Sequence, residues 1–306
     1  MKLLPTFFLV LVSLLAQAQT KQICITIDDL PIVPYGVSSS FTQFEITQKL
    51  LATFKEYDVP AIGYVNEGKL YNEGKLDQEK YKLLVYWVEN GFELGNHTYS
   101  HGSYHKVPFK DFTADVLKGE ELIRPLLKKN GYELKYFRHP FLHSGNTKGA
   151  TDSLNQFLEE HNYIEAPVTI DNEDYLFAKA YAKAYINGDS ALMKKIGIAY
   201  LEHSEKKLEF YEKMTTALFD RHIAQTMLTH ANQLNADYMG KLLEIFKKHG
   251  YTFVSQAASL KDVAYHEPIS KFGNWGISWL EKWTMSRGLK GDIWEGNPEV
   301  PKYITD

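Results

Sequence analysis

Two histidines, His97 and His101, stand four residues apart, so both imidazoles can turn toward one divalent metal ion. Catalytic zinc usually takes three protein ligands and keeps a fourth position for water, so a third donor is needed. The adjacent acids Asp28 and Asp29 are the obvious source. Neighbouring side chains at a strand end point different ways, so one carboxylate can bind the metal while the other performs acid-base work.

Short apolar runs alternate with amphipathic segments along the chain, which is typical of parallel βαβ units. We expect seven strands, at residues 22–28, 61–65, 92–97, 134–138, 164–171, 224–230 and 251–254. Helices are expected between them, among others at residues 41–57, 78–90, 111–129 and 237–248. The residues that could take part in catalysis fall at the C-terminal ends of these strands. In β/α barrels, active sites are built on that face.

Two segments fall outside this alternation. Residues 176–221 are predicted to form two or three helices inserted between strands five and six, either as a cover over one barrel face or as a lid of the substrate cleft. Residues 270–306 form a tail that holds four of the five tryptophans: Trp275, Trp279, Trp283 and Trp294. The spacing of the first three marks one helical face, which more often packs on a barrel than binds a ligand.

The first 18 residues read as a secretory signal peptide. Lys2 precedes an apolar run that is too short to cross a bilayer, and Ala16 and Ala18 provide a cleavage pattern. An uncleaved membrane anchor is the alternative. We therefore expect a secreted or periplasmic protein with no membrane span after signal removal, a barrel at residues 19–269 and an extension at residues 270–306.

Composition excludes some classes of protein. Cys24 is the only cysteine, so no disulfide forms within the chain, and its apolar neighbours predict a small buried side chain on a strand. The formal net charge is −4, with lysine and arginine spread among the acids. This pattern gives no indication of nucleic-acid binding. The sequence does not indicate an oligomeric state.

Five segments, taken in order, resemble the polysaccharide deacetylases, the NodB-homology group also called carbohydrate esterase family 4. They are residues 26–29, 97–101, 138–141, 171–175 and 228–230, and the resemblance covers about residues 22–254. It implies a distorted (β/α)7 barrel and a bound divalent metal, zinc first, with cobalt, nickel or manganese as alternatives. It also implies hydrolysis of N-acetyl or O-acetyl groups on an acetylated glycan.

The resemblance also implies roles for single residues. Asp29, His97 and His101 would be the metal ligands. Asp28 would be the general base for the attacking water, and Arg138 would hold that base by a charge-assisted hydrogen bond.

In the same pattern, His230 would be the general acid that protonates the leaving group. Asp174 would keep it charged, with Asp171 as a weaker candidate for that role. The metal and a backbone N–H near Phe141 would hold the developing oxyanion.

The chain departs from the family pattern at several positions. Leu30-Pro31 replaces a glycine after the two acids, Gly102 replaces a frequent proline, and Tyr175 replaces a frequent tryptophan. The identity of the glycan therefore does not follow from the resemblance. Two other functions remain open: a metal-dependent C–N hydrolase of small amides on the same barrel, and a carbohydrate-binding protein that has lost catalysis.

Overall fold

A computed structural model describes residues 20–305, so the predicted signal peptide at residues 1–18 lies outside the described part of the chain. Its centre is an eight-stranded sheet in the order β7-β6-β5-β2-β1-β9-β8, with β10 paired to the first residues of β1. Every pair in this sheet is parallel. The strands are β1 (Lys21–Leu30), β2 (Ile62–Val65), β5 (Glu93–Asn96), β6 (Tyr136–Phe137), β7 (Ile164–Glu165), β8 (Ile170–Asp171), β9 (Gln225–His230) and β10 (Tyr251–Phe253). A short hairpin, β3 (Tyr71–Asn72) and β4 (Lys75–Leu76), stands apart from the sheet.

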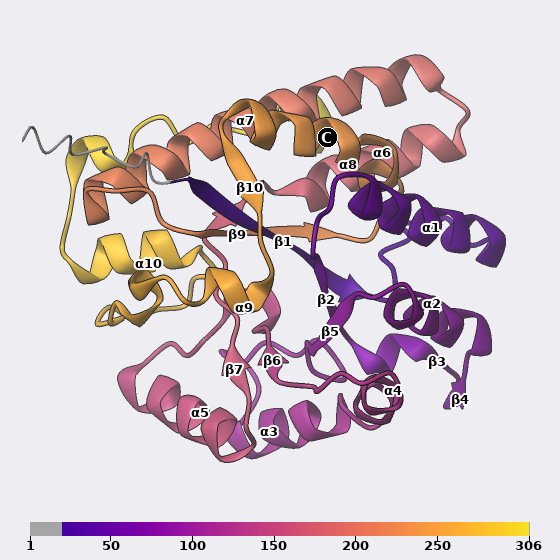
Figure 1. Cartoon of the computed structure of the whole chain (residues 1–306), viewed down its shortest axis with the longest axis horizontal. Coiled ribbons are helices and arrows are strands. Elements are labelled where there is room, and N and C mark those ends of the chain that lie inside the picture. The colour runs from indigo at the N-terminus through magenta and orange to yellow at the C-terminus, as the bar shows by residue number, and fades with distance from the viewer. Residues whose placement is uncertain (1–19, 306) are drawn as a thin grey trace, which may run out of the picture.

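The sheet is curled, and one segment links its two ends. β7 pairs with β6 and β8 pairs with β9, although only four residues separate β7 from β8. The single strand predicted at residues 164–171 is therefore wrong, because this segment changes its pairing partner midway. The architecture nevertheless confirms the predicted distorted (β/α)7 barrel, with helices packed around the sheet (Figure 1).

The central strand is buried on both faces, as expected for a parallel sheet covered by helices. Ile23, Ile25 and Ile27 are fully buried, and so is Cys24, which confirms the prediction for that residue. This apolar strand places the acids at its C-terminal end within the barrel mouth.

Eleven α-helices surround the described sheet. They are α1 (Ser40–Glu56), α2 (Gln78–Glu89), α3 (Phe109–Lys118), α4 (Ile123–Lys129), α5 (Lys148–Glu160), α6 (Asp174–Ile186), α7 (Ser190–Phe219), α8 (Gln233–Lys248), α9 (Gln256–Ser259), α10 (Trp279–Ser286) and α11 (Lys302–Thr305). The described residues also form four short 3₁₀ helices: Glu67–Leu70, Pro140–Leu142, Val263–His266 and Gly291–Trp294. None of the helices within residues 20–305 is long and apolar enough to cross a bilayer.

Two predicted helices differ from the structure. The helix expected at residues 111–129 is two helices, α3 and α4, which Gly119 separates. The helix expected from residue 237 begins at Gln233, because the side chain of Asn232 accepts a hydrogen bond from Asn235 N and caps α8.

The insertion is two helices, α6 and α7, which pack against each other and against α8 (Figure 1). It begins at Asp174, two residues earlier than predicted. In the tail, α10 buries Trp279 and Trp283, and Trp279 N donates to Val168 O at 2.7 Å. Trp275 precedes the helix cap Ser278, so the prediction that it shares their helical face is wrong. The domain boundaries themselves stay a prediction.

Candidate metal and catalytic site

The two adjacent acids, Asp28 and Asp29, both line one cavity because β1 carries a bulge. The register between β1 and β2 shifts between Ile27 and Leu30. Asp29 has a φ of 66°, in the left-handed region that side chains rarely adopt. Successive side chains of a regular strand point to opposite faces, and a bulge re-aims one of them. The bulge therefore lets both carboxylates reach the same site.

The structure brings the three predicted metal ligands together. Nε2 of His97 and Nε2 of His101 lie 3.5 and 3.2 Å from Oδ1 of Asp29. One ligand atom of each residue lies within 4.8 Å of the others. Nδ1 of His97 donates to the carbonyl oxygen of Arg138 at 2.7 Å, which leaves its Nε2 lone pair free for a metal.

The loop that carries both histidines follows β5, and contacts with α3 and with Tyr163 hold it in place. Asn96 is fully buried, and its Nδ2 donates to Val116 O at 2.9 Å and to Tyr163 Oη at 2.8 Å. Gly119 lies against the backbone of this loop, where a Cβ atom would be 2.5 Å from Thr98 C. Close packing of α3 on the loop therefore requires glycine at the end of that helix.

Burial and neighbouring charges together set the protonation states of the ligand side chains. It lowers the pKa of His97 well below the usual value, and the neighbouring His101 acts in the same direction. Burial also lowers the pKa of His101, although Asp29 opposes the shift. Both imidazoles are therefore neutral near pH 7, which is the form that binds metals. For Asp29, burial would raise the pKa, but Lys69 and the nearby histidines hold it below its usual range.

Lys69 is a site residue that the sequence reasoning missed. Its Nζ lies 3.1 Å from Oδ2 of Asp29 and donates to the Asp29 carbonyl oxygen at 3.0 Å. The lysine comes from the short helix after β2, and no spacing in the sequence connects it to the acids. It occupies one carboxylate oxygen of Asp29 and leaves the other to face the histidines.

These three side chains fit a divalent metal ion. Oδ1 of Asp29 is buried and has no hydrogen-bond partner within the described residues, although an unpaired buried carboxylate oxygen is costly. Two neutral imidazoles and one carboxylate are a donor set that zinc accepts, with room for a further ligand.

Asp28 lies beside the ligands and is paired with Arg138. Nη1 of Arg138 donates to Oδ2 of Asp28 at 3.3 Å, and both side chains are buried. The guanidinium also lies 4.5 Å from the centre of the Tyr64 ring and donates to Thr26 Oγ1. Burial raises the pKa of Asp28 to about 6, although Arg138 opposes the shift. A carboxylate with this pKa can take up a proton near neutral pH.

His230 contacts Asp174, the first residue of α6. Nδ1 of His230 lies 2.7 Å from Oδ1 of Asp174, and His230 N donates to Oδ2 of Asp174 at 3.0 Å. Asn235 Nδ2 donates to the same Oδ2 at 2.6 Å. Burial alone would lower the pKa of His230, but Asp174 raises it to about 9. Asp171, the other candidate partner, instead accepts a hydrogen bond from Glu173 N.

A cavity of about 480 Å³ unites these groups. Asp28, Asp29, His97, His101 and His230 line it, together with Asp171. The other lining residues are His139, Phe141, Tyr175 and Leu228 from the motif segments, and Tyr35, Leu142, His143 and Gly276 from outside them. Tyr175 belongs to the inserted helix α6 and Gly276 to the tail, so both additions to the barrel shape this cavity.

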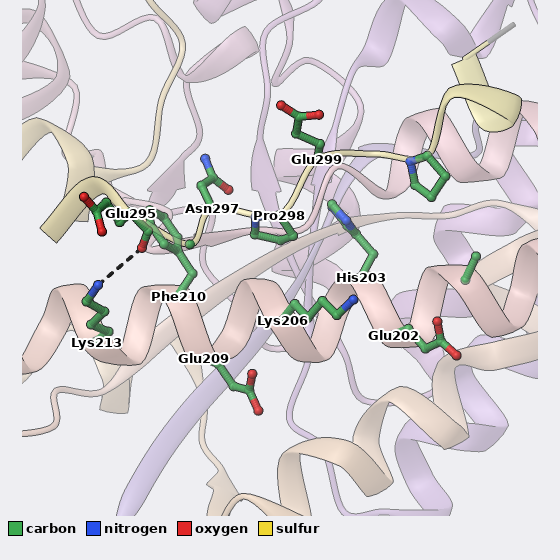
Figure 2. A pocket seen from close by; sticks show the side chains of 13 residues that line it. Glu202, His203, Lys206, Glu209, Phe210, Lys213, Glu295, Asn297, Pro298 and Glu299 are labelled. Carbon is green, nitrogen blue, oxygen red and sulfur yellow. Dashed lines mark hydrogen bonds between the residues drawn. The ribbon is translucent and has the colours of Figure 1, made fainter. Parts of the chain in front are cut away.

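A second cavity, of about 540 Å³, lies between α7 and residues 295–301. Figure 2 shows its mixed charges: glutamates come from both the helix and the facing segment, and lysines come from the helix alone. His203 lines it and lies 3.2 Å from Oε2 of Glu173, the neighbour of Asp174. None of the predicted site residues lines this cavity, so the chemistry belongs to the first one.

Comparison with known proteins confirms the resemblance seen in the sequence. Residues 16–161 match the profile of the family described as polysaccharide deacetylase. A curated relative from Bacillus cereus, named peptidoglycan-N-acetylglucosamine deacetylase, is 27% identical over 157 residues. That match covers 50% of this chain and 46% of the relative, so the chain spans about half of the relative's length.

Solved structures of carbohydrate esterase family 4 share the fold. The polysaccharide deacetylase Bc1974 from Bacillus cereus has a TM-score of 0.53 and 19% identity, over 77% of this chain and 91% of that one. A mutant of BA3943, a pseudoenzyme of the same family from Bacillus anthracis, has a TM-score of 0.52 and 15% identity, over 79% of this chain and 68% of that one. The fold thus occurs both in a deacetylase and in a protein described as a pseudoenzyme, and function has to be argued from the site.

Proposed function

We propose that this relative of the polysaccharide deacetylases is a metal-dependent deacetylase that hydrolyses the N-acetyl groups of a glycan. One observation carries the proposal: three side chains that could hold a metal ion, a buried carboxylate and a charged imidazole line a single cavity. The carboxylate is Asp28 and the imidazole is that of His230.

Asp29, His97 and His101 would hold the metal. A bound zinc ion would supply Lewis-acid activation of a water and of the acetyl carbonyl in this cavity. The other steps belong to the chain itself. Asp28 accepts the proton of the attacking water, and its contact with Arg138 fixes the carboxylate in one orientation.

His230 then donates a proton to the leaving nitrogen. With a pKa of about 9 it carries that proton at neutral pH, and Asp174 orients the ring by accepting from Nδ1. The backbone N–H of Phe141 would donate to the developing oxyanion. Two observations support this role: Phe141 lines the cavity, and its ring centre lies 4.4 Å from that of His101.

We infer an N-acetylglucosamine-containing polymer as the substrate class, because the curated relative carries the name of a peptidoglycan-N-acetylglucosamine deacetylase. The signal-like pattern of residues 1–18 supports secretion or export to the periplasm. Mass spectrometry of the protein from the extracellular fraction should give an N-terminus just after Ala18. An intact N-terminus on membrane-bound protein would contradict this prediction.

The test is acetate release from a panel of peptidoglycan, chitin oligomers, acetylated xylan and small N-acetyl amides. We expect release from at least one glycan, and its loss after chelation. No release from any glycan, with metal shown to be bound, would contradict the proposal. Release from the small amides alone would favour the C–N hydrolase, and glycan binding without turnover would favour the carbohydrate-binding protein.

A further inference from the structure

The tail of the chain runs along the loop at residues 139–146, which forms one wall of the cavity. Nδ2 of Asn146 donates to Oδ1 of Asn274 at 2.8 Å. The rings of Trp279 and His139 are stacked, with their centres 6.1 Å apart. Gly276 lies directly on the loop, where a Cβ atom would be 2.0 Å from Phe141 O. Residues of the tail therefore contact the loop along its whole length.

The loop holds an unfavourable backbone conformation. Phe141 and Leu142 have φ values of 57° and 55°, two consecutive left-handed residues that are not glycine. Such conformations persist only where the surrounding structure imposes them, and they concentrate at functional sites. Phe141 is also the residue whose N–H would face the oxyanion, so the strain lies at the point that must be placed accurately.

Lys282 of α10 binds two oxygen atoms of this loop. Its Nζ donates to Leu142 O at 2.8 Å and to Ser144 Oγ at 3.0 Å, and it lies 3.6 Å from the centre of the Trp279 ring. Lys282 as a whole is only 4% exposed. Burying an amine is costly, and an apolar side chain would fill the same space without that cost. The amine is therefore explained by the two loop oxygens that it binds.

We propose that Lys282 is a positioning residue of the active site, which fixes the Phe141 N–H by anchoring the Leu142 carbonyl and the Ser144 hydroxyl. This role rests on the proposed deacetylase function. Through Lys282, the tail would help to position a group of the active site. Burial lowers the pKa of Lys282 to about 7, with Glu165 opposing the shift, but an amine donates to both oxygens in either protonation state.

The test replaces Lys282 by methionine in the full zinc-loaded protein. Lys282→Met keeps the apolar stem and removes the donor. We expect kcat to fall at least tenfold while KM stays within threefold and the zinc content is unchanged. Amide hydrogen exchange at residues 139–145 should become faster. Ser144→Ala, which removes one of the two oxygens, should show a smaller change in the same direction and serves if the first variant does not fold.

The matched control is Thr284→Val in the same helix. Thr284 is also buried, but its hydroxyl donates to Leu280 O within α10. Wild-type kcat and unchanged loop exchange in a folded Lys282→Met would overturn the proposal, as would an equal loss in Thr284→Val. If the wild-type protein releases no acetate, the proposed function fails, and loop exchange still decides whether Lys282 anchors the loop.

Discussion

Asp28 and His230 are register partners on the neighbouring parallel strands β1 and β9. The two strand ends thus place a carboxylate and an imidazole in the same cavity. Their pKa values, about 6 for Asp28 and about 9 for His230, leave the first ionised and the second protonated between these limits. Those are the states that a general base and a general acid need before the reaction begins.

Replacing the base should remove turnover and spare the metal. Asp28→Asn keeps the size of the side chain but cannot take up the proton, so kcat should fall by roughly 10²–10⁴-fold. Zinc content by atomic absorption should stay at the wild-type level. Near-normal kcat in this variant would show that another group is the base.

The basic limit of the pH profile should follow His230. A general acid must hold its proton, so kcat should fall as the pH rises through about 9. Asp174→Asn removes the charge that raises this pKa, and the basic limb should move to lower pH. The kcat profile from pH 5 to pH 10 measures the shift, and an unmoved basic limb would contradict the assignment of His230 as the acid.

Arg138 should matter for stability as well as catalysis. The Arg138→Met variant leaves Asp28 buried without its partner, and breaking a buried ion pair in this way costs about 3–5 kcal/mol. Urea unfolding of the metal-free protein followed by circular dichroism gives the change in free energy. A loss below about 1 kcal/mol would match an exposed ion pair and not the buried contact described here.

The ligand loop should depend on a glycine remote from the metal. Gly119→Ala would place Cβ 2.5 Å from Thr98 C, so the loop has to shift and zinc affinity should fall at least tenfold. Competition with a chelating dye measures the dissociation constant. Gly149→Ala is the matched control, because nothing within the described residues lies within 4 Å of its Cβ position. Equal affinities in both variants would contradict the role of Gly119.

Much of this arrangement could be predicted from the sequence. Apolar runs followed by polar residues located Asp28, His97 and His230 at strand ends, and the order of the motifs indicated the barrel. What could not be predicted depends on contacts between segments far apart in the chain. The bulge at Asp29 exists only relative to β2, and the contact of Lys69 with Asp29 joins residues 40 positions apart.

The wrong prediction of one strand at residues 164–171 also involves contacts between distant segments. Pro167 interrupts the β-forming pattern within this segment and is a local signal against a single strand. The first part pairs with β6 and the second with β9, and this change of partner depends on distant segments. The choice between Asp171 and Asp174 likewise depends on where α6 begins. The helix starts at Asp174, and the carboxylate of Asp174, not that of Asp171, contacts His230.

The central claim is that Asp29, His97 and His101 bind a metal that the reaction requires. The most direct measurement titrates zinc into metal-free protein while acetate release is followed. We predict that activity rises in proportion to added zinc and reaches its plateau at one equivalent per chain, and that His101→Ala shows no such rise. Full acetate release by metal-free protein, or activity restored in His101→Ala by one equivalent of zinc, would contradict the account.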